Sequence, residues 1–117
     1  MSLLDTDTVI ELLRKRRYEV GSISIITLIE VLRGIQAEKR DKVKELLEES
    51  FSVVSLDNKV IKTYCNLYHK LKEEGTTIPD ADLLIAATAI SHDMPLKTGD
   101  EHFKRLKGLG LKLSNYH

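Results

Sequence analysis

Residues 79–98, PDADLLIAATAISHDMPLKT, decide the fold class of this chain. Positions 79–92 predict a helix that is apolar almost all round, and a helix of that kind is buried. Positions 95–98 follow as a short strand. A buried helix that leads into a strand is one unit of an alternating α/β pattern, and the same alternation recurs along the rest of the chain.

Outside this segment the sequence predicts strands at 2–4, 20–25 and 51–56, with a possible fifth edge strand at 111–114. It predicts helices at 7–17, 26–34, 37–49, 57–75 and 100–106. Alternating strands and helices favour a three-layer α/β/α fold with a central parallel sheet of four to five strands. In the long helix the expected inward-facing residues are Val60, Ile61, Tyr64, Leu67, Tyr68 and Leu71.

Bulk composition places the chain among globular proteins. Its 117 residues predict one domain, 1–117, and 42% hydrophobic with 31% charged residues supports a packed core. No apolar run approaches the roughly 20 residues of a membrane span, and no signal-type segment is present, so we expect a cytoplasmic protein. Cys65 stands alone and the four histidines lack ligand-like spacing, which argues against zinc. Lys plus Arg (18) balances Asp plus Glu (18), so nucleic-acid affinity requires local patches.

Four acids are expected to converge at one edge of the sheet. Asp5 closes the first strand, Asp100 follows the fourth, Asp82 begins the apolar helix, and Glu30 interrupts an otherwise apolar helix. Ligands of open parallel sheets lie beyond the carboxyl ends of the strands. Clustered carboxylates resist ionising together unless a cation neutralises them, and oxygen ligands select hard ions such as Mg²⁺ or Mn²⁺.

Each acid also has an ordinary structural explanation. Asp5 and Asp100 can cap the helices that follow them, Glu30 can pair with Arg33, and Asp82 can complement a helix dipole. Asp80 fits best as part of a capping box with Thr77. For any one acid alone the structural explanation is favoured, and only the convergence of four favours a metal site.

The opening LLDTDT (3–8) permits a second interpretation. Its D-x-D-x-T pattern resembles that of haloacid dehalogenase-like phosphatases, in which Asp5 would attack phosphorus and Asp7 would act as general acid. That family has a longer core and usually a cap domain, for which 117 residues leave little room. The phosphatase interpretation also leaves Glu30 and Asp82 without a function, so we place it second.

From Leu4 to Leu113 the sequence resembles the PIN-domain ribonucleases of the VapC type, the toxins of VapBC toxin–antitoxin pairs. The resemblance is carried by LLDTDTVI, by ISIITLIEVLRG and, most specifically, by IPDADLLIAATAISHDMPLKTGDEHFKRL. It implies that Asp5, Glu30, Asp82 and Asp100 hold one or two divalent ions, with Thr6 and Thr98 as supporting hydroxyls. Asp7 replaces the family's usual Asn, where it either strengthens metal binding or caps the first helix. His102 stands where the family often has a second acid, which puts an auxiliary function at that position in doubt.

The resemblance also implies an activity and partners: metal-assisted hydrolysis of an RNA phosphodiester, an antitoxin protein that inserts into the active-site groove, and a homodimer. A catalytically silent PIN-like binding module is the further alternative. Apolar residues of the first two helices suit an interface (Leu12, Leu13, Leu28 and Leu32). Basic residues at helix ends are candidates for contacts to the RNA backbone, although such charged helix ends are usually only solvated. The candidates are Arg14, Lys15, Arg16, Arg17, Lys104, Arg105 and Lys107.

Overall fold

The structure is a computed structural model that describes residues 1–114. Its elements, in chain order, are β1 (Leu3–Leu4), α1 (Thr6–Lys15), β2 (Ser22–Ser24), α2 (Ile25–Arg33), α3 (Ala37–Ser50), β3 (Ser52–Val54), α4 (Asn58–Glu73), α5 (Asp80–Ser91), β4 (Leu96–Lys97) and the 3₁₀ helix η1 (Glu101–Leu109). Every helix expected from the sequence is present, and the strands are shorter than expected. Across the described residues, no helix is both long and apolar enough to cross a membrane.

A parallel sheet of four strands in the order β3-β2-β1-β4 organises residues 1–114. Leu3 of β1 pairs with Ser22 of β2 on one side and with Leu96 of β4 on the other. The possible fifth strand at 111–114 is reduced to one parallel bridge between Leu96 and Leu113. Because all four strands run in the same direction, their carboxyl ends lie at the same edge of the sheet.

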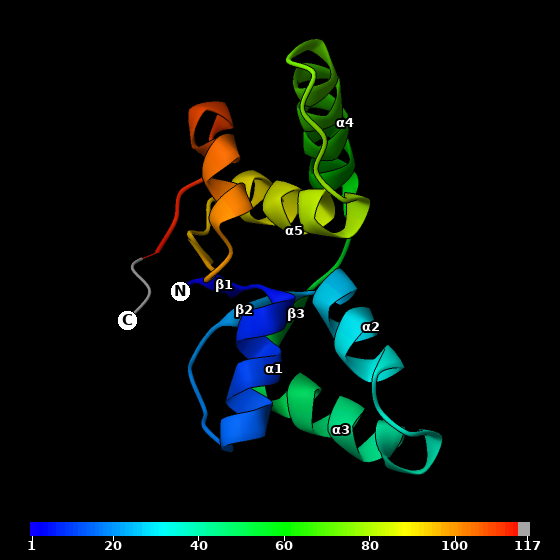
Figure 1. The fold of residues 1–117 in the computed structure, drawn as a ribbon. Coiled ribbons are helices and arrows are strands. Elements are labelled where there is room, and N and C mark those ends of the chain that lie inside the picture. The colour runs from blue at the N-terminus through cyan, green and yellow to red at the C-terminus, as the bar shows by residue number, and fades with distance from the viewer. Residues whose placement is uncertain (115–117) are drawn as a thin grey trace.

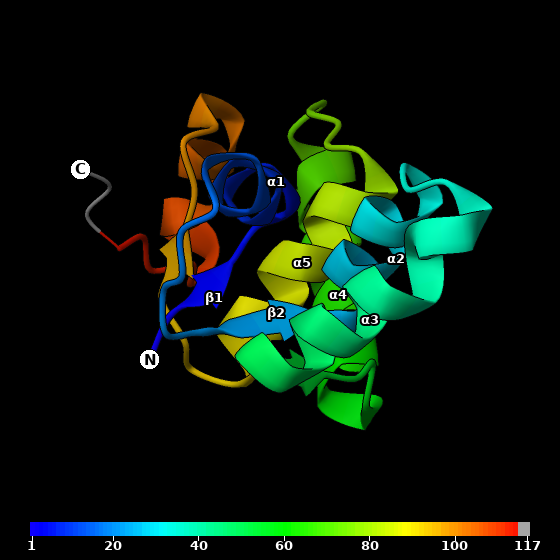
Figure 2. The ribbon, with the colours of Figure 1, turned by 90° about the horizontal axis from the view of Figure 1, so that it is seen from below.

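Helices cover both faces of this sheet (Figure 1). Helices α1, α2 and α3 lie on one side, and α4, α5 and η1 lie on the other. Figure 2, seen from below, shows α1, α2 and α3 in front of the strands. The α/β/α layering predicted from the sequence is therefore confirmed.

Two hydrophobic clusters, one on each face, hold the layers together. Successive strand residues point to opposite faces, so Leu3 packs into the cluster around α4, α5 and η1, whereas Leu4 packs into the cluster around α1, α2 and α3. Both leucines are fully buried. Ala86 and Ala89 of α5 are also fully buried, in agreement with the buried helix predicted from the sequence.

Several detailed predictions are wrong. Ile61 and Tyr68 of α4 are 51% and 44% exposed, because α4 extends beyond the sheet and buries only a narrow stripe. Leu28, expected at an interface, lies in the core with 3% exposure. The capping box at Thr77 does not form: Pro79 is the N-cap of α5 without a side-chain cap bond, and Asp80 accepts a hydrogen bond from Tyr64 Oη at 2.6 Å.

The close approach of β1 and β2 yields a stability prediction. A Cβ at Gly21 would lie 2.2 Å from Leu4 Cδ1 and 3.1 Å from the Ser2 carbonyl oxygen. Since Leu4 is buried and cannot swing into solvent, we expect Gly21→Ala to lower the free energy of unfolding by about 1–3 kcal/mol. Urea denaturation measures the loss. Gly108→Ala is the control, because a Cβ there meets nothing within 4 Å, and equal stability of the two variants would contradict the packing argument.

Candidate active site

A small acidic pocket lies at the carboxyl edge of the sheet. Its volume is about 190 Å³, and its lining residues come from the ends of β1 and β4 and from α1, α2, α5 and η1: Asp5, Thr6, Asp7, Ile10, Glu30, Arg33, Asp82, Asp100 and Phe103. All four acids that the sequence placed at this edge are among them. The parallel sheet brings together acids as far apart in the chain as Asp5 and Asp100.

Asp5 is the most buried of the four acids. It is only 4% exposed, and its backbone N–H donates to the Lys97 carbonyl at 3.2 Å, which ties the end of β1 to β4. Asp5 Oδ1 accepts from the backbone N–H of Thr8 at 3.0 Å, and Asp5 Oδ2 accepts from the Thr98 hydroxyl. Asp5 is therefore both the N-cap of α1 and a wall of the pocket, so the two explanations of this residue hold together.

Glu30 is positioned by hydroxyl groups from two helices. The Thr6 hydroxyl donates to Glu30 Oε1 at 2.6 Å and lies 3.1 Å from the Thr27 hydroxyl. Glu30 Oε2 lies 3.5 Å from Arg33 Nη2. Glu30 Oε1 is thus fixed where α1 contacts α2. Glu30 Oε2 faces the partly exposed guanidinium of Arg33 at the mouth of the pocket.

Asp82 and Asp100 are joined by a residue whose contribution the sequence did not reveal. His102 Nε2 lies 3.0 Å from Asp82 Oδ2, and His102 Nδ1 lies 2.7 Å from Asp100 Oδ1. Asp100 also caps η1, accepting from the backbone N–H of His102 at 3.1 Å. The spacing of the histidines in the sequence did not indicate these contacts, because Asp82 lies on a different helix, α5, and Asp100 lies in the segment just before η1. The available signal was the place of His102 two residues after Asp100, where the resembled family often has a second acid.

The charge balance of the pocket fits a divalent cation. Five carboxylates line it (Asp5, Asp7, Glu30, Asp82 and Asp100), and within residues 1–114 Arg33 is its one cationic lining residue. Partial burial raises the pKa of Asp7 above its usual range, and the negative charges of Asp5, Asp100 and Glu30 raise it further. Oxygen-rich sites with excess negative charge suit Mg²⁺ and Mn²⁺.

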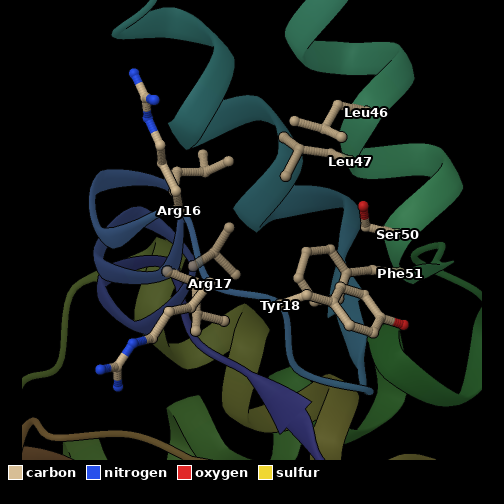
Figure 3. A pocket seen from close by; sticks show the side chains of 10 residues that line it. Arg16, Arg17, Tyr18, Leu46, Leu47, Ser50 and Phe51 are labelled. Carbon is tan, nitrogen blue, oxygen red and sulfur yellow. The ribbon is translucent and has the colours of Figure 1, made fainter.

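A second cavity, of about 290 Å³, opens between α1 and the end of α3 (Figure 3). Leucines and the rings of Tyr18 and Phe51, whose centroids are 6.2 Å apart, form much of its wall. Arg16 and Arg17 stand at its edge, and none of its lining residues is acidic. This apolar cavity lacks the oxygen ligands that a hard cation requires, whereas the acidic pocket offers them.

The basic residues are distributed unevenly around the site. Arg16 and Arg17 follow α1, about 15 Å along the helix from its acidic end, at 1.5 Å per residue. Lys15 lines an open groove of about 540 Å³ that shares Asp7 and Asp100 with the acidic pocket. Lys15 lies 3.0 Å from Glu11. The groove thus combines a cation with the carboxylates of the pocket.

Comparison with known proteins decides the family. The PIN domain model matches residues 3–109. The chain is 44% identical over 115 residues to Ribonuclease VapC1 of Methanocaldococcus jannaschii, covering 95% of this chain and 85% of that protein. This chain belongs to the VapC family of PIN-domain ribonucleases. Ribonuclease VapC1 of Rickettsia felis is 30% identical, with 92% of this chain and 91% of that protein covered.

Solved structures agree with this assignment. The VapBC-1 structure from nontypeable Haemophilus influenzae superposes with a TM-score of 0.84 at 25% identity, covering 97% of this chain and 96% of that chain. FitAcB from Neisseria gonorrhoeae gives a TM-score of 0.75 at 27% identity over 98% and 97% of the two chains. Membership of the VapC family confirms the resemblance predicted from the sequence and decides against the phosphatase interpretation.

The hydroxyl between Asp5 and Asp100 yields a prediction for metal affinity. Thr98 Oγ1 donates to Asp5 and accepts from the backbone N–H of Asp100 at 2.9 Å. Thr98→Val keeps the shape but removes both bonds, and groups that orient ligands typically contribute 10–100-fold to metal affinity. We therefore expect Mn²⁺ to bind roughly 10–100-fold more weakly, as measured by calorimetry. Thr63→Val on α4, outside the pocket, is the control, and unchanged Mn²⁺ affinity in Thr98→Val would contradict the orienting function.

The raised pKa of Asp7 yields a prediction for stability against pH. A carboxyl whose pKa is higher in the folded state favours unfolding once it ionises, so its penalty is present at neutral pH and absent below the unfolded value of 3.8. Asp7→Asn should therefore stabilise the metal-free protein at pH 7, by less than about 1 kcal/mol, because the side chain is only partly desolvated and much of it still contacts water. Chemical denaturation at pH 7 and pH 3.5 measures this. A gain that is larger at pH 3.5 would contradict the assigned cause.

Proposed function

We propose that this protein is a metal-dependent endoribonuclease, the toxin of a type II toxin–antitoxin pair, with Asp5, Glu30, Asp82 and Asp100 as the ligands of Mg²⁺ or Mn²⁺. One observation carries the proposal: carboxylates from four separate elements line one pocket in a chain of the VapC family. Carboxylates that lie close together without a counter-ion repel one another, and a bound cation relieves that repulsion.

The chain's own residues bind and orient the participants. A divalent ion bound in this pocket would activate water and offset the charge that develops on the phosphate. Thr6 and Thr98 hold Glu30 and Asp5 in fixed orientations. Arg33, at the mouth of the pocket with 72% of its side chain exposed, is placed to bind a phosphate of the incoming RNA.

Asp5 is poorly arranged as a covalent nucleophile. Both of its oxygens accept hydrogen bonds, from Thr8 and Thr98, and the residue is 4% exposed. Such bonds stabilise the carboxylate and reduce its tendency to attack. Hydrolysis by an activated water is therefore the favoured reaction, and the catalytically silent module remains as the alternative to be tested.

Family membership also supports a proposal for partners and location. The solved relatives include a toxin–antitoxin complex from Klebsiella pneumoniae and a DNA-bound VapBC from Salmonella typhimurium. We extend this to an antitoxin protein that holds this chain inactive, to a homodimer, and to action on RNA in the cytoplasm. Exposed apolar residues such as Ile29 and Ile61, 55% and 51% exposed, provide surface for such contacts.

The decisive experiment compares two aspartates of the same helix. Asp82 lines the acidic pocket, whereas Asp80, two residues earlier, is hydrogen-bonded to Tyr64 and raises the pKa of that tyrosine to about 12. Cleavage of a structured RNA should require Mn²⁺ or Mg²⁺, and Asp82→Asn should lower its rate by at least about 100-fold. Asp80→Asn should retain most of the activity.

Three results would contradict the proposal. Full cleavage activity in Asp82→Asn would show that Asp82 is not a metal ligand. An equal loss of cleavage activity in Asp80→Asn and Asp82→Asn would show that the loss comes from a less stable helix. Absence of RNA cleavage, together with no rise in melting temperature on adding Mn²⁺, favours the silent binding module. Circular dichroism of both variants verifies that they fold.

A further inference from the structure

His102 occupies an unusual place between two of the pocket carboxylates. Its ring nitrogens face Asp82 on α5 and Asp100 at the start of η1, at 3.0 and 2.7 Å. Together the three residues present ligand atoms that all lie within 4.8 Å of one another. Two ligands that bind one ion at about 2.2 Å each are separated by up to about 4.4 Å. Within the trio, the 3.0 Å between His102 Nε2 and Asp82 Oδ2 is short enough for these two atoms to bind one ion.

Both ring nitrogens of His102 have a carboxylate partner, and further contacts on the Asp100 side fix the orientation of the ring. Asp100 Oδ1 faces both the Nδ1 atom and the backbone N–H of His102, the latter at 3.1 Å. The ring also stacks on Phe103, with centroids 5.3 Å apart and planes 23° apart, and Phe103 is 1% exposed. These contacts hold Nδ1 against Asp100 and direct Nε2 toward Asp82.

This arrangement matches the chemistry of a metal-binding histidine. Such a histidine almost always donates its second ring N–H to a carboxylate or carbonyl, which fixes the tautomer and leaves the other nitrogen free to coordinate. Here Asp100 Oδ1 faces Nδ1, and Nε2 points at Asp82, which lines the acidic pocket. Asp100 Oδ1 is the oxygen that both the Nδ1 atom and the backbone N–H of His102 contact.

We propose that His102 Nε2 is a ligand of the divalent ion beside Asp82, with Asp100 holding the ring through Nδ1, so that the site binds Mn²⁺ in preference to Mg²⁺. This rests on the proposed function, because it assumes that the acidic pocket holds the ion. Mg²⁺ takes oxygen ligands and retains its waters, whereas first-row transition ions accept imidazole nitrogen readily. A set of carboxylates alone would accept either Mg²⁺ or Mn²⁺. A site with one nitrogen ligand as well thus favours Mn²⁺ over Mg²⁺.

The direct test is pulsed electron paramagnetic resonance of Mn²⁺ bound to the untagged full-length chain. A coordinated imidazole produces a characteristic ¹⁴N modulation, which carboxylate and water ligands do not produce. We expect this modulation in the unmodified protein and its loss in His102→Asp, which restores an oxygen ligand, and in His102→Asn. His92→Asn is the matched control, because His92 lies 2.9 Å from Asp57 and does not line the acidic pocket.

Calorimetry supplies the second measurement. The ratio of Mn²⁺ to Mg²⁺ affinity should fall at least about tenfold in His102→Asp and remain unchanged in His92→Asn. An unmodified protein without ¹⁴N modulation, or a modulation that persists in both His102 variants, overturns the proposal. An unchanged affinity ratio in folded His102→Asp overturns it as well.

These outcomes separate this inference from the proposed function. RNA cleavage that depends on Mn²⁺ but shows no ¹⁴N modulation leaves the nuclease assignment intact and removes His102 from the ligand set. A clear modulation that disappears in His102→Asp, in a protein that does not cleave RNA, establishes the ligand and contradicts the nuclease function. Thermal unfolding of each variant without metal verifies that the substitutions leave the fold in place.

Discussion

The parallel pairing of β1 between β2 and β4 is the constraint on which the pocket depends. Leu3 pairs with Ser22 and Leu96, and the next backbone bond, from Asp5 N–H to the Lys97 carbonyl, places Asp5 beside Thr98. Since parallel strands end at one edge, every residue that follows a strand is delivered to the same place. A shift of one residue in this register would turn Leu3 and Leu4 toward the wrong hydrophobic clusters, so burial of these leucines fixes the site geometry.

The same groups serve the fold and the pocket. Asp5 caps α1, Asp100 caps η1, and Glu30 joins α1 to α2 through Thr6. Hydrogen bonds from caps stabilise ionised carboxylates, which offsets part of the repulsion among them. Removing one acid therefore changes both local stability and metal affinity, and isosteric replacements such as Asp to Asn are the appropriate probes.

The sequence predicted the order of the elements and the four acids at the sheet edge because these follow from hydrophobic periodicity and from the direction of parallel strands. It did not predict His102, because a contact between η1 and α5 depends on how two helices pack and not on spacing along the chain. Exposure of Ile61 and Tyr68 was missed for a related reason: periodicity identifies an apolar face but not how much of a long helix the core covers. The roles assigned to Asp5, Glu30, Asp82 and Asp100 remain predictions for experiment.

The most direct test of the account is an anomalous diffraction measurement on crystals grown with Mn²⁺, with data collected near the manganese absorption edge. The account predicts an anomalous peak inside the acidic pocket, in contact with carboxylate oxygens of the four acids that converge there. A well-ordered structure that shows these four side chains but no peak among them, at Mn²⁺ concentrations that raise the melting temperature, would contradict the central claim.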